Sequence, residues 1–372
     1  MTKISKRTRL QLFIEILKDP ERKPLFLMIF EFFNLLFTYK EFPRYYFSRY
    51  LYKKGMKNVR NYLPNKLIMT IAPFFNDQKV KEVIDNKLYF DLFYRQFNIS
   101  LPKILMYNHK KLFIVCNDCN KNIEVNNVQD FKVLLEEIFK QDSSGDSIFI
   151  KKTYSSASGR NAYKLFLQQI REDTEILQEL YSEIINSEFL FQETVRQHPD
   201  LNKLTTASLN TIRFDTFIDS DGKVDIISSL LKMSTNKSHV DNTMSGGCMV
   251  GVKLPTGTLK KFGYSKIKIS GCKVLTEHPI TKTQFEDLSI PYFSQAKELV
   301  IKAAGFIPGL RLVGWDMAIG ESGPVLIEGN SDYGIKDNDL LDGGYFANDK
   351  FRKVLHEING SGKSGASYPM KL

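Results

Sequence analysis

The sequence contains few cysteines, and their number excludes a disulfide framework. Four cysteines among 372 residues are too few to stabilise a chain of this length through disulfide bonds and are typical of a reducing compartment. Cys116 and Cys119 form a CxxC pair, but no second pair follows at the spacing of a zinc ribbon. We therefore interpret both as ordinary free thiols, with metal or redox use as the less favoured alternative.

Long apolar segments are also missing. The most apolar early run, residues 24–39, is shorter than the roughly 20 residues that span a bilayer and contains Glu31 near its middle. The basic start of the chain lacks the apolar region and the small-residue cleavage site of a secretory signal. We expect a cytoplasmic protein without a transmembrane helix.

Acidic residues are scarce near the N-terminus. The net charge is +10, and residues 1–60 hold 14 Lys and Arg against 5 Asp and Glu. Aromatic residues are mixed with the basic ones, which suits an anionic membrane surface or nucleic acid, while a packed appendage with solvated cations is the simpler alternative. No nucleic-acid motif occurs. We expect no nucleic-acid partner, and we predict at most a peripheral contact with the inner face of the membrane through residues 1–60.

Prolines, turn residues and changes of periodicity divide the chain into five segments. The turn-rich stretch QDSSGDS, residues 141–147, separates a helix-rich first part from a second part in which strands dominate. The predicted segments are a basic, aromatic-rich helical region at 1–66, an α/β region at 67–145, α+β regions at 146–200 and 201–357, and a flexible tail at 358–372.

Two carboxylates and an amide interrupt the apolar stretch GWDMAIGESGPVLIEGN, residues 314–330. A hairpin closed by a five-residue turn, 320–324, sets Ile319 against Val325 and Asp316 against Glu328. Directly opposed residues have Cβ atoms about 4.5–5.5 Å apart. Asn330 lies two residues beyond Glu328 and therefore projects from the same face.

The other face of this predicted hairpin is wholly apolar and calls for a packed core. It carries Trp315, Met317, Ile319, Val325 and Ile327. Opposed carboxylates repel one another unless a cation lies between them, and a surface pair bridged by Lys or Arg is one solution. The third oxygen ligand and the apolar reverse face favour the other solution, a site for Mg²⁺ or Mn²⁺.

Two further segments suit an anionic ligand. The small-residue loop SSASGRNA, residues 155–162, follows a strand with two lysines and can offer backbone N–H groups to phosphate, although it lacks the P-loop arrangement. Asp221-Gly222 predicts a two-residue type I′ turn that sets Thr211 opposite Lys232. Arg213 shares that face, so Arg213 and Lys232 converge on an anion or, alternatively, on solvent.

In order, these pieces resemble the ATP-grasp family, and most closely its sugar-transfer-associated branch. The resemblance lies in QETVRQHPDLNKLTTASLNTIRFDTF, in HPITKTQFEDLSIPYF and in RLVGWDMAIGESGPVLIEGNSDYG, and it extends from about residue 86 to residue 333. It implies an α+β ATP-grasp fold, in which two α+β subdomains clasp ATP, with a helical basic N-terminal extension. The small subdomain would be 146–200, and 201–357 would hold the magnesium site.

The resemblance also implies a role for individual residues. Glu328 would bridge two Mg²⁺ ions, and Arg213, with Lys232 beside it, would stabilise the transferred phosphoryl group. His198 is a second candidate, beside Asp200, for the ribose contact. The implied metal ligands are Asp316, Glu328 and Asn330. The implied nucleotide contacts are Lys87, Lys151 or its neighbour Lys152, the flap residues Ser155, Ser156, Ser158 and Gly159, the adenine hinge Glu193, Thr194 and Val195, and Asp200.

The chemistry that this resemblance implies is ligation of a carboxylate to an amine through an acylphosphate. The expected substrates are a sugar acid or glycan precursor and an amine or amino acid, in surface polysaccharide or capsule biosynthesis. The candidates for substrate contact are His239, Asn242, Gly246, Gly247 and His278. Two alternatives stay open: a kinase that phosphorylates a sugar or small metabolite, and a non-catalytic nucleotide-binding scaffold of a glycan assembly complex.

Overall fold

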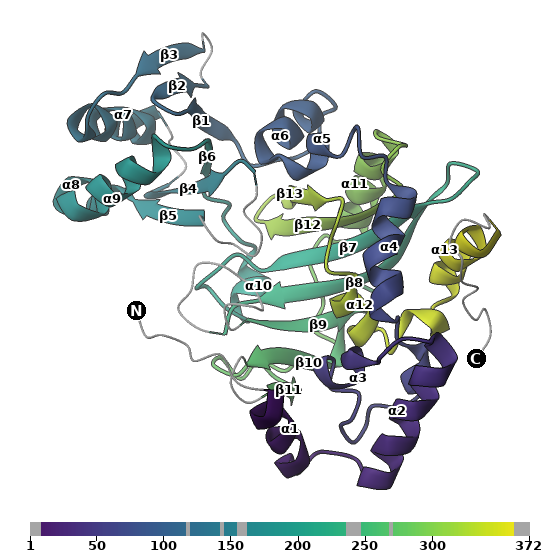
Figure 1. Cartoon of the computed structure of the whole chain (residues 1–372). Coiled ribbons are helices and arrows are strands. Elements are labelled where there is room, and N and C mark those ends of the chain that lie inside the picture. Colours follow the sequence, from purple (N-terminus) through teal and green to yellow (C-terminus); the bar gives the residue numbers. More distant parts are fainter. Residues whose placement is uncertain are drawn as a thin grey trace. The chain divides into compact units, whose positions relative to one another are not determined.

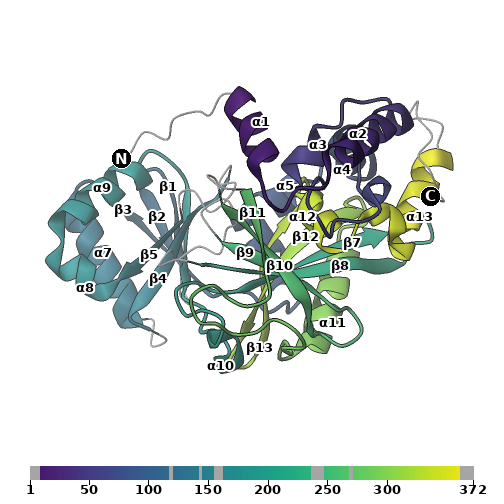
Figure 2. The same ribbon diagram turned by 90° about the horizontal axis from the view of Figure 1, so that it is seen from below.

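The computed structural model describes residues 9–116, 120–141, 145–154, 162–235, 247–267 and 271–360. The chain folds into two compact units. One comprises Met1–Ile71 together with Asp342–Leu372, and the other comprises Ala72–Leu341. Figures 1 and 2 show the helices and strands that make up each unit.

The first unit is helical. Proline and glycine punctuate its short helices, and its buried side chains include Leu35, Tyr45 and Tyr46. The buried Arg49 guanidinium donates hydrogen bonds to Leu63 O at 2.8 Å and to Asn65 Oδ1 at 3.1 Å. Its elements are α1 (Arg9–Lys18), α2 (Leu25–Tyr39), α3 (Arg44–Ser48), η1 (Val59–Asn61), the larger part of α4 (Asn65–Phe75), η4 (Tyr345–Ala347) and α13 (Asp349–Gly360).

The second unit begins with a six-stranded antiparallel sheet in the order β3-β2-β1-β6-β4-β5. Three helices pack on it and bury a core of aliphatic and aromatic side chains around Phe113 and Phe131. The strands are β1 (Ile104–His109), β2 (Leu112–Val115), β3 (Lys121–Glu124), β4 (Ser147–Lys152), β5 (Ala162–Phe166) and β6 (Phe189–Glu193). The helices are α7 (Val128–Gln141), α8 (Leu167–Glu172) and α9 (Thr174–Ile184).

A seven-stranded antiparallel sheet follows, in the order β11-β10-β9-β8-β7-β12-β13. Figure 2 shows α11 and α12 on opposite faces of this sheet. Its strands are β7 (Thr211–Ile218), β8 (Val224–Met233), β9 (Cys248–Val252), β10 (Leu259–Ile267), β11 (Gly271–Leu275), β12 (Leu312–Gly320) and β13 (Gly323–Asn330). The remaining helices are α5 (Glu82–Asp85), α6 (Lys87–Arg95), α10 (Pro199–Asn202), α11 (Phe293–Gly305) and α12 (Ile335–Leu341).

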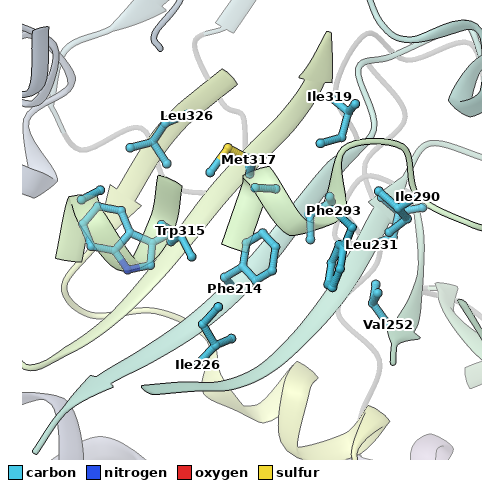
Figure 3. Packing of buried hydrophobic residues seen from close by; sticks show 14 of the residues in the cluster. Phe214, Ile226, Leu231, Val252, Ile290, Phe293, Trp315, Met317, Ile319 and Leu326 are labelled. Carbon is cyan, nitrogen blue, oxygen red and sulfur yellow. The ribbon is translucent and has the colours of Figure 1, made fainter. Parts of the chain in front are cut away.

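The face of this sheet toward α11 is apolar, as the alternation of side chains along β12 predicts. Trp315, Met317 and Ile319 are buried there beside Phe214 and Phe293 (Figure 3). Side chains at alternate positions of β7 and β12 therefore project to the opposite face. That opposite face carries the polar residues of the candidate site.

The β12–β13 turn differs from the prediction. Gly320 pairs with Gly323, so Glu321 and Ser322 form a two-residue turn in place of the predicted five-residue one. Ala318 consequently pairs with Val325, and Ile319 with Pro324. The backbone of residues 196–197 holds this turn, since Glu321 N donates to Arg196 O at 3.2 Å. The predicted pairing of Ile319 with Val325 was wrong.

A β-bulge restores the predicted register at the acidic residues. The register shifts between Asp316 and Met317, and Asp316 pairs with Glu328 as predicted. Because of the shorter turn and the bulge, Leu326 enters the core, whereas Val325 and Ile327 are only half-buried. The predicted core positions of Val325 and Ile327 were therefore wrong, and Leu326 takes their place.

The β7–β8 hairpin shows the same compensation. Its loop has three residues, Ser220 to Gly222, because Asp219 N donates to Lys223 O at 3.0 Å, and only Gly222 of the three has a positive φ. A type I′ turn requires positive φ at both central residues, so that prediction was wrong. A bulge after Asp215 restores the register, and Thr211 pairs with Lys232 as predicted.

Candidate active site

A cavity of about 1200 Å³ opens within the second unit. Residues of both sheets and of α12 line it. One part of its wall comes from β4, β6 and the segment after β6, and another part comes from β7, β8, β12 and β13. Such a volume is large enough for a nucleotide and a second small molecule together.

Two carboxylates and an amide line this cavity from neighbouring strands. Asp316 lies on β12, while Glu328 and Asn330 lie on β13. The Asp316 side chain is 6% exposed and that of Glu328 is 27% exposed, so the pair is largely withdrawn from solvent. The Asn330 amide nitrogen is buried and has no hydrogen-bond partner among the described residues.

Cations surround these carboxylates. The Arg213 guanidinium donates from Nε to Asp316 Oδ1 and from Nη2 to Asp316 Oδ2, both at 2.7 Å. Lys232 Nζ lies 2.7 Å from Asp316 Oδ1, and Lys87 Nζ lies 3.4 Å from Glu328 Oε2. Arg213 and Lys232 thus share one face, and in this structure they meet at the Asp316 carboxylate rather than in solvent.

These contacts set the charge states of the cluster. Burial alone would raise the pKa of the Asp316 carboxyl, but Arg213 and Lys232 hold that pKa well below its usual range. Burial opposes the charge of the Arg213 guanidinium as well, yet Asp316 raises the Arg213 pKa further above its usual value. Both groups are therefore ionised at neutral pH.

Two residues far away in the sequence fix the chain directly after Asn330. Asn76 Nδ2 donates to Ser331 O at 2.7 Å and to Leu312 O at 2.8 Å, so it ties the end of β13 to the start of β12. The Asp85 carboxylate accepts from Ser331 N at 3.0 Å and from Ser331 Oγ at 2.7 Å. Because these contacts hold Ser331, they also fix the backbone that carries Asn330.

A tyrosine supports the arginine. The Arg213 guanidinium lies 5.8 Å from the centroid of the Tyr333 ring. That ring packs over Gly314, where an added Cβ would lie 2.6 Å from a ring carbon. Glycine at this strand position therefore makes room for the aromatic ring under Arg213.

The predicted nucleotide contacts fall into three groups. Lys87, Lys151, Glu193, Thr194 and Val195 all line the cavity. Lys152 and Asp200 are not among the described residues that line it. The Asp200 carboxylate instead pairs with Lys203 at 2.6 Å. His198, the other ribose candidate, accepts from Asp200 N through Nδ1 and so caps α10. Ser155, Ser156, Ser158 and Gly159 lie outside the described residues.

The predicted substrate contacts are mostly not placed at the cavity. His239, Asn242 and Gly246 lie outside the described residues. Gly247 is buried next to β9, and neither it nor His278 is among the described residues that line the cavity. The buried His278 ring donates from Nε2 to Ser234 O at 2.9 Å and accepts from Thr281 N at 3.3 Å, as a histidine that fixes a loop would.

Asn338 on α12 is a cavity residue that the sequence analysis missed. It is 2% exposed, and neither its amide nitrogen nor its amide oxygen has a hydrogen-bond partner among the described residues. A buried polar group without a partner is costly, so an unpaired amide in a cavity wall points to a ligand or water. Its sequence context, IKDNDLL, gave no signal beyond a polar position in a short helix.

The cluster fits the donor set of a hard divalent cation. Two carboxylates and one amide supply only oxygen ligands, which suit Mg²⁺ and Mn²⁺. Rotating the Asn330 amide by half a turn would put its oxygen where the unpartnered nitrogen lies. Among the residues that the structure describes, no three His, Cys, Asp or Glu side chains form a metal cluster by themselves. The amide is thus needed to complete the set.

Together, the two sheets and the polar cavity define an α+β protein with a charged ligand site, and comparison with known proteins gives its family. A family model for sugar-transfer associated ATP-grasp proteins matches residues 69–348. The chain belongs to this family, and the predicted ATP-grasp resemblance and α+β fold are confirmed. ATP and Mg²⁺ are the ligands typical of ATP-grasp proteins.

Solved structures provide further similarities. D-alanyl-alanine synthetase A from Vibrio cholerae is 14% identical, with a TM-score of 0.39, over 74% of this chain and 65% of that chain. The biotin carboxylase domain of 2-oxoglutarate carboxylase from Hydrogenobacter thermophilus is 13% identical, with a TM-score of 0.38, over 70% of this chain and 42% of that one. The chain therefore spans less than two thirds of either structure. No curated protein matches it.

Proposed function

We propose that this protein is an ATP- and Mg²⁺-dependent ligase that joins a carboxylate to an amine through an acylphosphate. The observation that carries the proposal is the meeting of Asp316, Glu328 and Asn330 with Arg213 and Lys232 in one cavity. Acidic ligands suit the metal ions that accompany ATP, and the cations suit the phosphoryl group being transferred. Membership of the ATP-grasp family supports this assignment.

In the proposed reaction a carboxylate oxygen of the substrate attacks the γ-phosphorus of ATP, and ADP leaves. The amine then attacks the acyl carbon, phosphate leaves, and the amine loses a proton as the amide forms. Asp316, Glu328 and Asn330 would hold the metal, which when bound neutralises phosphate oxygens. Arg213 and Lys232 would then exchange the Asp316 carboxylate for the phosphoryl oxygens and stabilise their charge. No covalent bond to the enzyme is required.

The nucleotide would lie between the two sheets. Lys151, which lines the cavity and lies 5.2 Å from the Phe149 ring centroid, would contact phosphate rather than Lys152. Glu193, Thr194 and Val195 would contact adenine. Lys87, already beside Glu328, would contact the phosphates at the metal end.

The second substrate would bind toward α12. There Lys336 offers an exposed cation to a carboxylate, and the unpartnered Asn338 amide can donate through its nitrogen and accept through its oxygen from neighbouring hydroxyl or amide groups. Both properties suit a sugar acid or glycan precursor, with an amine or amino acid as the other substrate. The family description, sugar-transfer associated, supports a place in surface polysaccharide or capsule biosynthesis.

Incubating the protein with ATP, Mg²⁺, a panel of uronic acids and a panel of amines tests this proposal. We expect ADP release that requires both an acid and an amine, together with an amide product detected by mass spectrometry. A stable phosphorylated product formed without amine would support the kinase alternative instead. Full biological function of a Glu328→Gln variant would support the non-catalytic scaffold.

We also propose that the protein works in the cytoplasm, peripherally bound to the inner face of the membrane through residues 1–60. The surplus of nine positive charges in this segment supports an attraction to anionic lipid. Within the described part of the chain, no helix is both long and apolar enough to cross a bilayer. Binding to the surface of anionic vesicles is the direct test.

A further inference from the structure

Helix α2 exposes an unusually large apolar face. Five of its residues are between 49% and 75% exposed, namely Phe26, Ile29, Phe30, Phe33 and Phe37. Their spacing of three, four or seven residues places them on one side of an α-helix. The other side contributes the buried Met28 and Leu35 to the unit's own core. The exposed stripe is thus separate from the residues that hold the helix in place.

The single acidic residue of α2 is neutralised away from this stripe. Both Glu31 oxygens accept from Lys23 Nζ at 2.8 Å, and one of them also accepts from the Tyr46 hydroxyl at 2.7 Å. The side chains of Lys23 and Glu31 are 8% and 15% exposed. A buried, hydrogen-bonded pair of this kind leaves the exposed stripe without a negative charge.

Two more acidic residues of this unit are also held by internal contacts. Asp19 pairs with Lys53 at 3.1 Å and accepts from the Tyr52 hydroxyl. The Glu41 oxygens accept from the backbone N–H groups of Asn65 and Lys66 at 2.9 Å, at the start of α4. Between residues 14 and 71 this leaves two exposed acids, Glu15 and Glu21. The exposed cations of that range are Lys18, Lys40, Arg44, Lys54, Lys57, Arg60 and Lys66.

We infer that α2 lies in the surface of an anionic membrane, with its aromatic stripe at the boundary between head groups and acyl chains. This inference rests on the proposed membrane contact of residues 1–60 and names the element that makes it. Helix α2 has no Lys or Arg of its own, so the basic residues come from the rest of its unit. An apolar helix face in a unit with surplus exposed cations suits an anionic lipid surface. The 15 residues of α2 extend over about 22 Å, which suits a helix lying in the plane of the membrane. Charge complementarity favours lipid over a second copy of the chain, because two copies would bring like-charged surfaces together.

A vesicle experiment with the full chain tests this surface. The probes are vesicles of phosphatidylcholine alone and vesicles with about 30% phosphatidylglycerol, at about 0.1 M and 0.5 M salt. We expect co-sedimentation with the anionic vesicles at low salt, and at least about tenfold weaker partitioning at high salt or without the anionic lipid.

A triple variant and a matched control locate the contact. Phe26→Ser, Phe30→Ser and Phe37→Ser together should weaken partitioning at least about tenfold, because three aromatic rings no longer enter the interface. The control changes three exposed apolar residues of the other unit, Phe262, Val274 and Ile280, to serine, and should bind within about twofold of the parent. Circular dichroism and thermal unfolding would verify that both variants fold.

Three results would overturn the inference. They are equal binding of the parent and the α2 variant, equal binding to neutral and anionic vesicles, and a parent dimer in light scattering that the α2 variant converts to a monomer. ADP release in the absence of vesicles should be the same in the parent and the α2 variant. If the parent and the α2 variant bind anionic vesicles equally, the role of α2 fails while the proposed membrane contact of residues 1–60 stands. If the parent does not bind, both fail, and neither result bears on the proposed ligase activity.

Discussion

The β7–β8 and β12–β13 hairpins lie side by side in one sheet and bring opposite charges to the same cavity. Arg213 and Lys232 come from the first hairpin, and Asp316 and Glu328 come from the second. The inner strands β7 and β12 pair so that Arg213 is directly opposite Asp316. The cations of one hairpin thus pair with a carboxylate of the other, so binding of metal and phosphate would break these side-chain contacts while β7 and β12 stay paired.

The outer strands of the two hairpins are held differently. The end of β13 is tied by Asn76 and Asp85, which bond to Ser331. The residue after β8, Ser234, is held by the His278 ring. The acidic hairpin is thus fixed by an amide and a carboxylate, whereas the cationic hairpin is fixed in part by a buried imidazole whose pKa burial lowers.

Removing the Asp316 charge from the acidic hairpin should have the largest effect. Asp316→Asn is expected to lower kcat by about 10³-fold, because it removes a proposed metal ligand and leaves Arg213 and Lys232 without their carboxylate. In the absence of metal, the variant should bind nucleotide at least as tightly as the parent, as measured by calorimetry. Asp287→Asn, which changes an exposed carboxylate that pairs with Lys253, is the matched control and should behave as the parent. Near-normal turnover of Asp316→Asn would contradict the assigned site.

Removing the arginine of the cationic hairpin should come next. Arg213→Met is expected to reduce kcat by about 10²-fold with a smaller change in the KM for ATP, because in the proposed reaction the contribution of Arg213 grows as charge develops on the phosphoryl group. The free energy of unfolding of this variant should also be lower by about 3–5 kcal/mol, because the buried Asp316 carboxylate then keeps only Lys232 as a partner. Steady-state kinetics and urea unfolding measure these effects. A change in KM alone would show that Arg213 only binds substrate.

Loosening the tie at the end of β13 should have a moderate effect. Asn76→Ala removes two hydrogen bonds that its amide donates and one that it accepts from Leu312 N at 2.9 Å. We expect the free energy of unfolding to fall by about 2–3 kcal/mol and Mn²⁺ to bind about tenfold more weakly. Electron paramagnetic resonance measures the Mn²⁺ binding. Asn122→Ala, at an exposed position of β3, serves as a comparison. Unchanged Mn²⁺ affinity in a folded Asn76→Ala variant would separate this tie from the metal site.

The smallest effect should be the pH dependence conferred by His278. Burial lowers the pKa of its ring, and the contact with Ser234 O partly opposes this shift. The unfolded chain therefore binds a proton more readily than the folded one, so this contribution to stability is present above the usual histidine pKa of about 6.5 and is lost as pH falls toward the lowered value. Thermal unfolding from pH 7.5 downward should show a shallower slope for His278→Gln. An equal slope would contradict the assignment.

Much of the site could be predicted from local patterns. The alternation of side chains in strands places Asp316, Glu328 and Asn330 on one face, and the pairings of Asp316 with Glu328 and of Thr211 with Lys232 were correct. Both turns were nevertheless predicted wrongly. The pairings held because a bulge in each hairpin offset the turn, and a bulge leaves no clear mark in the sequence.

Other features required contacts between distant parts of the chain. Asn76 and Asp85 reach Ser331 across about 250 residues, and nothing near either residue indicates such a partner. Lys151 and Lys152 could not be separated from the sequence, whereas the cavity wall includes Lys151. Asn338 became visible only when its amide was found buried without a partner.

The sequence by itself determined which chemical groups share a strand face, because the two-residue period of a strand is a local property. It therefore determined that two carboxylates and an amide share one face of a hairpin. It also determined that an arginine and a lysine share a face of another hairpin. The tertiary structure decided that these two sets face each other, since β7 and β12 pair over a separation of about 100 residues. Such pairing depends on sheet order and long-range packing, which no local pattern encodes.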